Sequence, residues 1–272
     1  MIRQSKNWAL PILLLLAMQA SAEGPAVDGV NGKITAQGGR SGGSDGSLLD
    51  GVITFPIAQS WGAQLDGGGG RLGHSSLSSV GGHLFWRDPD SGLLGLTASH
   101  HSSGGATAQR VGIEAEGYLS DFTLSARAGY QRRTLDTPIG SATDNKTYTR
   151  LRGSWYATEN LAISARLQHV DSTRSALEVE WQPGINGMAG LSAIASYGRD
   201  ASSKTNTTVI GVRYYLDREK SLIKRHRTGD PDSSTEFNSY WGGGSCTVDG
   251  MSGYWVQVGN QGSCVVPPPY PW

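Results

Sequence analysis

One ten-residue stretch near the middle of the chain carries the pattern that decides the fold: Phe122-Thr123-Leu124-Ser125-Ala126-Arg127-Ala128-Gly129-Tyr130-Gln131. Apolar residues fill every second position from Phe122 to Tyr130, and polar residues or glycine fill the positions between them. Successive side chains of a β-strand point to opposite faces. The stretch therefore predicts a strand with one apolar face and one polar face.

The same alternation recurs along most of the chain. It is clear around residues 110–116, 161–168 and 176–181. About twelve such segments fit between Gly32 and Leu216, each close to the roughly 9–11 residues that a tilted strand needs to span a membrane. An even number of strands suits a closed up-and-down antiparallel transmembrane β-barrel, which is the all-β fold that we predict.

A soluble β-sandwich is the competing interpretation, because its strands also alternate. Its facing sheets would need large aliphatic residues, whereas many apolar-face positions here are small, and the opposite face is rich in charge. The small positions are Ala63, Gly82, Ala98, Ala115, Ala126, Ala128 and Gly153. A wall of this kind favours lipid outside and a polar lumen inside.

Turn lengths give an expectation of orientation. Short polar turns are predicted at Ile57–Ser60, Asp88–Gly92, Ser120–Asp121, Thr158–Asn160 and Gln182–Gly187. Longer Gly- and Ser-rich links are predicted between them, at Gly67–Ser79, Ser102–Gln109, Thr134–Lys146 and Arg199–Asn206. Because outer-membrane barrels have short periplasmic turns and longer outer loops, both chain termini of the barrel are expected to face the periplasm.

The first segment is typical of a secretory signal. Arg3 and Lys6 precede an apolar run from Trp8 to Met18, and Ala20-Ser21-Ala22 supplies small residues for cleavage. We therefore predict a signal peptide at 1–22, a lead at 23–31, the barrel at 32–216, a basic and Gly-rich linker at 217–245 and a tail at 246–272. The predicted location is the bacterial outer membrane.

Composition narrows the class of partner. The chain carries 23 basic and 23 acidic residues, so it has no excess of positive charge with which to neutralise nucleic-acid phosphates. The expected partner is outer-membrane lipid, and no nucleic acid is expected.

The segment Thr207-Thr208-Val209-Ile210-Gly211-Val212-Arg213-Tyr214-Tyr215-Leu216, together with the alternating strands and the signal peptide, resembles Gram-negative outer-membrane β-barrel proteins. In that group the last strand is read by the barrel-assembly machinery, and Gly211, Tyr214 and Leu216 match its spacing. The resemblance implies a barrel of this architecture and the assembly machinery as a partner during biogenesis. It does not select a function, because one architecture hosts porins, enzymes and structural barrels.

If the apolar faces meet lipid, nine charged residues line the lumen: Glu114, Glu116, Arg127, Arg150, Arg152, Arg166, Glu178, Glu180 and Arg213. Opposed arginines and glutamates on neighbouring strands can pair and fill the barrel. Alternatively, the arginines form fixed positive sites along a narrow conduit for a small anionic solute.

A weak catalytic candidate lies where the fifth strand meets a loop. His100 and Ser102 share one face, so a base and a hydroxyl could meet there. The pair is similar to that of outer-membrane phospholipase A, and Gln109 on the next strand is the candidate for the orienting third residue. No cofactor and no metal site are expected, because Gly68-x-Gly70-x-x-Gly73 precedes no helical pattern and the histidines lack zinc-ligand spacing.

The tail carries two further expectations. Cys246 and Cys264 are the only cysteines, and an exported chain meets an oxidising compartment, so we predict one disulfide. The basic run Lys220–Arg227 and the Pro-rich end are expected to be solvated on the periplasmic side, where the tail could recruit a partner.

The sequence thus predicts a non-enzymatic outer-membrane barrel that acts as a structural or surface protein or as a narrow passive channel for small solutes. Two alternatives remain open. One is a lipid hydrolase that uses His100 and Ser102, and the other is a membrane anchor whose periplasmic tail recruits a partner.

Overall fold

A computed structural model describes residues 24–103, 106–137, 140–170, 172–185, 188–217, 220–234, 245–248, 251–258 and 261–265. For residues 135–137, 140 and 245–265 it describes the backbone alone. The predicted signal peptide at 1–22 lies outside the described residues.

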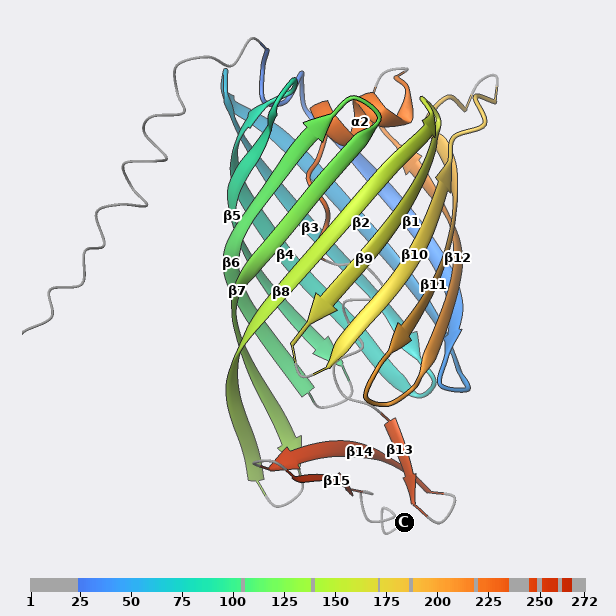
Figure 1. Ribbon diagram of the computed structural model, residues 1–272. Helices are drawn as coiled ribbons and strands as arrows, with labels where there is room; N and C mark the ends of the chain where they lie inside the picture. Colours follow the sequence, from blue (N-terminus) through green and yellow to red (C-terminus); the bar gives the residue numbers. More distant parts are fainter. Residues whose placement is uncertain are drawn as a thin grey trace, which may run out of the picture.

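Twelve antiparallel strands form one closed barrel, in which each strand pairs with its neighbours in the sequence and β1 pairs with β12 (Figure 1). The strands are β1 (Asn31–Ser41), β2 (Ser44–Ala58), β3 (Trp61–Leu72), β4 (Ser75–Asp88), β5 (Gly92–Ser103), β6 (Ala106–Leu119), β7 (Phe122–Thr137), β8 (Gly140–Thr158), β9 (Leu161–His169), β10 (Thr173–Trp181), β11 (Leu191–Asp200) and β12 (Asn206–Tyr215). The predicted closed barrel of about twelve strands is confirmed. A two-sheet sandwich is wrong, because the sheet closes on itself.

The two faces of the wall follow the alternation in the sequence. In β7, Phe122 and Leu124 are exposed on the outside, whereas Thr123 between them is buried. In β10, Leu177 and Val179 are exposed outside and Glu180 is buried inside. The barrel is therefore apolar outside and polar inside, which is the reverse of a soluble protein and suits a lipid surround.

The apolar outer band does not run the full length of the strands. We call the end of the barrel that carries the turn at 120–121 the α2 end, after the helix described below, and the opposite end the far end. Exposed aromatic residues lie close to the α2 end: Phe122, Trp155, Trp181 and Tyr214. Toward the far end the outward positions become polar or charged, with exposed residues that include Arg40, Asp45, Arg71, Arg132 and Arg199. Several strands therefore extend beyond the apolar band at the far end only.

The predicted difference between short and long connections is wrong. Gly67–Leu72 belongs to β3 and pairs with β4, so that the predicted link Gly67–Ser79 reduces to the two-residue turn 73–74. Likewise, only residues 104–105 separate β5 from β6, and only 138–139 separate β7 from β8. Weak strand propensity of Gly and Ser is overridden here, because pairing with a neighbouring strand satisfies their backbone hydrogen bonds.

A short helix closes one end of the barrel. Helix α2 (Leu222–Thr228) follows β12 and lies across the mouth at the α2 end (Figure 1). Leu222 is fully buried against Tyr156, Ala162 and Tyr215. Among the described residues, no helix is long and apolar enough to cross a membrane.

The lead segment packs at the same end. Ala26 and Val27 are buried against Phe85 and Leu93, and the Ala26 amide donates to the Gln59 carbonyl over 2.6 Å. Lys220 Nζ lies 2.8 Å from Asp28 Oδ1, which joins the lead to the segment that precedes α2. The lead and α2 thus close the mouth together.

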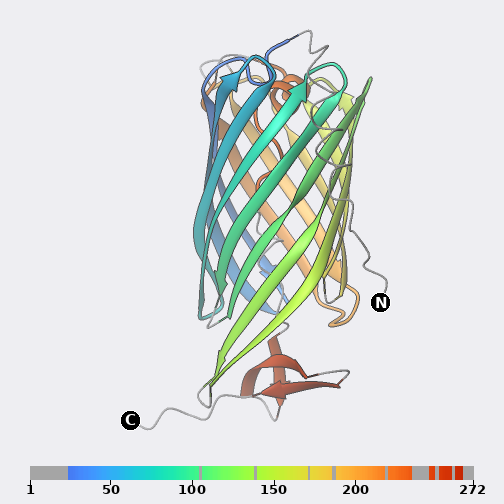
Figure 2. The ribbon, with the colours of Figure 1, turned by 90° about the vertical axis from the view of Figure 1, so that its left-hand side faces the viewer.

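A separate three-stranded sheet lies beyond the far end of the barrel (Figures 1 and 2). Its strands are β13 (Ser245–Val248), β14 (Met251–Val258) and β15 (Gln261–Val265), with β14 in the centre. The sequence analysis placed the whole tail on the periplasmic side, together with both chain termini of the barrel. The position of this sheet, beyond the end opposite to α2, does not support that expectation. Cys246 and Cys264 lie in β13 and β15, but their side chains are outside the described residues, so the disulfide stays a prediction.

Candidate functional site

The interior of the barrel holds a segment of the same chain. Residues 229–234, which we call the plug, leave the end of α2 and run into the lumen (Figure 1). Asp230, Ser233 and Ser234 are buried there. The sequence analysis assigned residues 217–245 to a linker, and that interpretation is wrong for the described part, since residues 220–234 pack into the barrel.

The carboxylate of Asp232 is held by arginines from β8. Arg152 Nη1 donates to Asp232 Oδ1 over 2.9 Å, and Arg150 Nη2 lies 3.4 Å from Oδ2. Arg127, on β7, donates from Nη2 to the Asp232 carbonyl over 2.7 Å. Three arginines on adjacent strands thus converge on one plug residue, through both its side chain and its backbone.

A second set of contacts holds the two plug serines. The backbone amide of Ser234 donates to Asp66 Oδ2 over 2.8 Å, and the Ser234 hydroxyl donates to the same oxygen. The Ser233 hydroxyl donates to Asp66 Oδ2 over 3.2 Å. Gly81 on β4 makes this approach possible, because a Cβ at that position would lie 2.0 Å from Ser234 Oγ.

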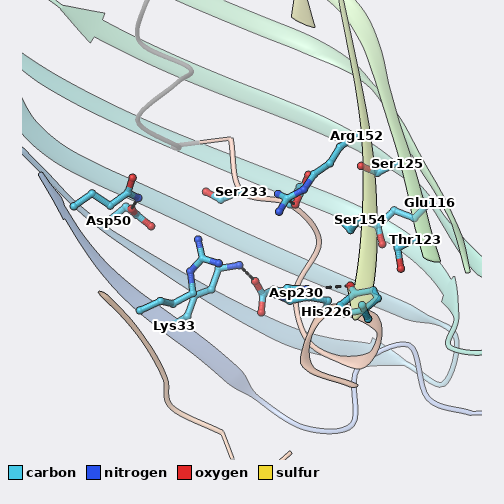
Figure 3. Close-up of a pocket in the computed structure, with 14 residues that line it drawn as sticks. Lys33, Asp50, Glu116, Thr123, Ser125, Arg152, Ser154, His226, Asp230 and Ser233 are labelled. Carbon is cyan, nitrogen blue, oxygen red and sulfur yellow. Dashed lines mark hydrogen bonds and ion pairs between the residues drawn. The ribbon is translucent and has the colours of Figure 1, made fainter. Parts of the chain in front are cut away.

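The plug is also tied at its entry. Asp230 forms a buried ion pair with Lys33 of β1, and Figure 3 shows the two side chains pointing toward each other. Arg87 Nη1 donates to the Gly229 carbonyl over 2.7 Å and to the Ala26 carbonyl over 3.2 Å. The same arginine therefore binds both the plug and the lead.

Helix α2 is fixed by polar contacts as well as by Leu222. Arg225, which is 1% exposed, pairs with Asp217 and donates from Nε to Gln182 Oε1 over 2.9 Å. Arg227 donates from Nη2 to the carbonyls of Ser120 and Phe122. The expectation that this basic run is simply solvated is wrong, because these arginines satisfy groups of the barrel mouth.

The nine residues expected to line the lumen all lie on inward positions of the wall. Arg127 of β7 pairs with Glu114 of the neighbouring strand β6 at 2.8 Å, and Arg152 of β8 pairs with Glu178 of β10, two strands away, at 2.8 Å. Arg166 Nη2 lies 3.6 Å from Glu178 Oε2, and Arg213 pairs with Glu180. Two further residues, Arg150 and Glu116, border the cavity or the plug at Asp232.

The free space beside the plug is small. The cavity beside the plug, part of which Figure 3 shows, has a volume of about 40 Å³ and is lined by Lys33, Glu116, Arg152, Asp230 and Asp232 among others. Since one water molecule needs roughly 10–15 Å³ on this measure, the cavity admits only a few waters. Beside the plug, the described residues therefore leave no room for a solute larger than a few heavy atoms.

A histidine between two carboxylates was not among the residues singled out from the sequence. His83 Nδ1 lies 2.8 Å from Glu114 Oε1, and His83 Nε2 lies 3.1 Å from Asp66 Oδ1. Ser234 donates to Asp66 and not to His83, so the histidine cannot act as a base for that hydroxyl. The cluster contains a hydroxyl, an imidazole and carboxylates, as a catalytic triad does, but it lacks the hydrogen bond between the hydroxyl and the imidazole.

The candidate hydrolase residues lie on the wall toward the far end. His100 of β5 stands opposite Gln109 of β6 in the register, and His100 is exposed on the outside. Within the part of the chain that the structure describes, no hydrogen bond links His100 to Ser102 or to Gln109. The register brings the residues to one region but does not assemble a base with a nucleophile.

One signal in the sequence pointed toward the plug. The inward positions near the middle of the wall carry more arginine than acid, and Asp230 and Asp232 follow the barrel within a short acidic stretch. Excess positive charge inside a barrel needs a counter-charge. Alternation alone could not reveal that the chain itself supplies it.

Comparison with known proteins bears on the fold. No protein-family model and no curated protein matches the chain. Among solved structures, the chain is similar to the NanC porin, with 12% identity, 66% of this chain and 98% of that chain covered, and a TM-score of 0.51. It is also similar to the KdgM porin in complex with disordered oligogalacturonate, with 10% identity, 67% and 98% of the two chains covered, and a TM-score of 0.50. The closed barrel, its apolar outer wall and these likenesses together give the chain the fold of outer-membrane β-barrel proteins of the porin type.

Proposed function

We propose that this protein is a non-enzymatic outer-membrane anchor that carries its own C-terminal residues through the barrel to the cell surface. The observation that carries the proposal is the course of the chain. Helix α2 lies at one end, residues 229–234 lie inside the lumen, and β13–β15 lie beyond the opposite end (Figures 1 and 2). A chain arranged in this way crosses the membrane once more, inside its own barrel.

The orientation that we propose has the α2 end in the periplasm. Exposed aromatic residues stand close to the α2 end, whereas the strands extend as polar walls at the far end. Outer-membrane barrels keep their periplasmic ends short and extend on the outside. The far end, with the β7–β8 hairpin and the small sheet, would then face the exterior.

A passive channel is less well supported as the resting state. The cavity beside the plug holds only a few waters, and the plug is bound by ion pairs on several strands. Removal of one partner from a buried ion pair strongly destabilises the structure that contains the other. Withdrawal of the plug from the lumen therefore costs free energy. We therefore propose a barrel that is closed at rest.

The proposal also covers the assembly machinery and the disulfide. Strand β12, the last of the barrel, is proposed as the segment that the assembly machinery reads. On the cell surface Cys246 and Cys264 would meet an oxidising environment, and a disulfide between them would stabilise the small sheet. Faster migration of the unreduced protein in a denaturing gel, lost in a Cys246→Ala variant, is the expected result.

The experiment that tests the proposal maps the C-terminus in intact cells. One epitope tag follows Trp272, and a matched tag is inserted in the turn at 120–121 of the α2 end. We expect antibody to bind the first tag on intact cells and the second only after the outer membrane is permeabilised. Binding of both tags only after permeabilisation would place the tail in the periplasm and refute the proposal.

A further inference from the structure

We infer that Arg150 and Arg152 form a binding site for a small carboxylate and that Asp232 of the plug occupies it as an internal ligand. The inference rests on the closed lumen of the proposed function, but it concerns the wall and would hold whichever end faces the exterior.

The geometry around Asp232 is that of a bound carboxylate ligand. Each of its two oxygens faces a different guanidinium, Oδ1 at 2.9 Å from Arg152 and Oδ2 at 3.4 Å from Arg150. Arginine recognises carboxylates through planar, charge-assisted hydrogen bonds. The guanidinium groups of the wall thus form the binding site, and Asp232, from another part of the chain, supplies the bound carboxylate.

The site lies in a buried cluster of charged side chains. Four arginines lie here on β7, β8 and β9, and Glu114, Glu116 and Glu178 are acidic residues of the wall in the same region. The arginines are Arg127, Arg150, Arg152 and Arg166. Removal of the Asp232 carboxylate takes one negative charge away from Arg150 and Arg152, and the loss of one partner from a buried ion pair is costly. A carboxylate from solution would restore the balance.

A small cavity lies directly beside the site. Arg152, Asp232 and Ser233 border the small cavity beside the plug, together with polar groups such as Ser125 and Ser154 (Figure 3). Its volume of about 40 Å³ suits a species of a few heavy atoms. Removal of the Asp232 carboxyl group would enlarge this space by about the size of formate.

Chemical rescue tests the inference in the full-length protein. The Asp232→Ala variant removes the carboxylate, and its thermal unfolding midpoint in detergent micelles is followed by circular dichroism. We expect the midpoint to fall below that of wild type and to rise again with increasing sodium formate. Sodium chloride at the same ionic strength serves as the control, because it reproduces screening without a carboxylate. In wild type, where Asp232 fills the site, formate should leave the midpoint unchanged.

A second variant shows whether the arginines are responsible. Arg150→Gln and Arg152→Gln are introduced together with Asp232→Ala, and rescue by formate should disappear although the protein still folds. Equal stabilisation by formate and chloride would overturn the inference and leave only general screening. Rescue that survives the loss of both arginines would overturn it as well. Neither result bears on the side of the membrane that carries the C-terminus, so failure here and failure of the epitope mapping are distinguishable.

Discussion

Gly81 provides the sharpest test of the plug, because its missing side chain leaves the space that Ser234 fills. A Cβ at position 81 would lie 2.0 Å from Ser234 Oγ and 2.8 Å from Asp66 Oδ2. Both distances are shorter than any normal contact of a Cβ atom. In a Gly81→Ala variant the Ser234 hydroxyl must therefore move by about 1 Å or more, which breaks its hydrogen bond to Asp66.

The size of the effect follows from that bond. A hydrogen bond to a charged group contributes about 1.5–3 kcal/mol. Since about 1.4 kcal/mol changes an equilibrium tenfold, loss of this bond should raise the ratio of open to closed barrels roughly ten- to a hundred-fold. This value counts only the loss of the hydroxyl hydrogen bond and assumes that the backbone hydrogen bond from Ser234 to Asp66, which measures 2.8 Å, stays intact. It is therefore a lower limit for the change in the ratio.

Single-channel conductance in a planar bilayer measures that ratio. Wild type should be almost always closed, whereas Gly81→Ala should open far more often. Gly82→Ala is the matched control, because a Cβ there would meet only Leu65 and Gln64 at 3.6 and 3.7 Å. Ser234→Ala should resemble Gly81→Ala, since it removes the same bond. If Gly81→Ala and Gly82→Ala both conduct as wild type does, then either the plug does not close the lumen or Ser234 does not hold it.

Three further predictions concern the wall, the mouth and the catalytic alternative. Leu151→Arg puts a charge on the outer apolar face of β8, four residues from Trp155 toward the middle of the strand, and should lower the free energy of unfolding in lipid by about 2–4 kcal/mol, measured by denaturant titration in vesicles, whereas Thr173→Arg at the polar far end should change it little. Leu222→Ala removes a side chain that is 0% exposed in the barrel mouth, and should destabilise the packing of α2 by about 2–5 kcal/mol. Helix α2 should then detach, and limited proteolysis should cleave within residues 217–229. Resistance to proteolysis equal to that of wild type would contradict the packing described. Wild type and Ser102→Ala should release fatty acid from phospholipid vesicles at the same background rate, and activity that depends on Ser102 would restore the hydrolase alternative.

The alternation of apolar and polar residues along each strand made it possible to predict the barrel from the sequence. Each strand buries or exposes side chains with a period of two, so residues 122–131 already indicated which side chains meet lipid and which face inward. The same logic put Glu114 and Arg127 on the lumen side, where β6 and β7 pair them directly. Loop lengths were a poorer guide, since Gly- and Ser-rich segments such as Gly67–Leu72 complete the sheet by pairing with a neighbour.

The sequence by itself determined the wall of this protein, because alternation is a local property of each strand. Only the tertiary structure decided what fills the barrel. Asp232 meets Arg152 across 80 positions of the chain, and Ser234 meets Asp66 across 168. Contacts of that kind depend on the closure of the sheet, which brings inward side chains from many strands around one axis. The position of residues 229–234 inside the lumen brings Asp230 and Asp232 to the basic side chains that this closure gathers there.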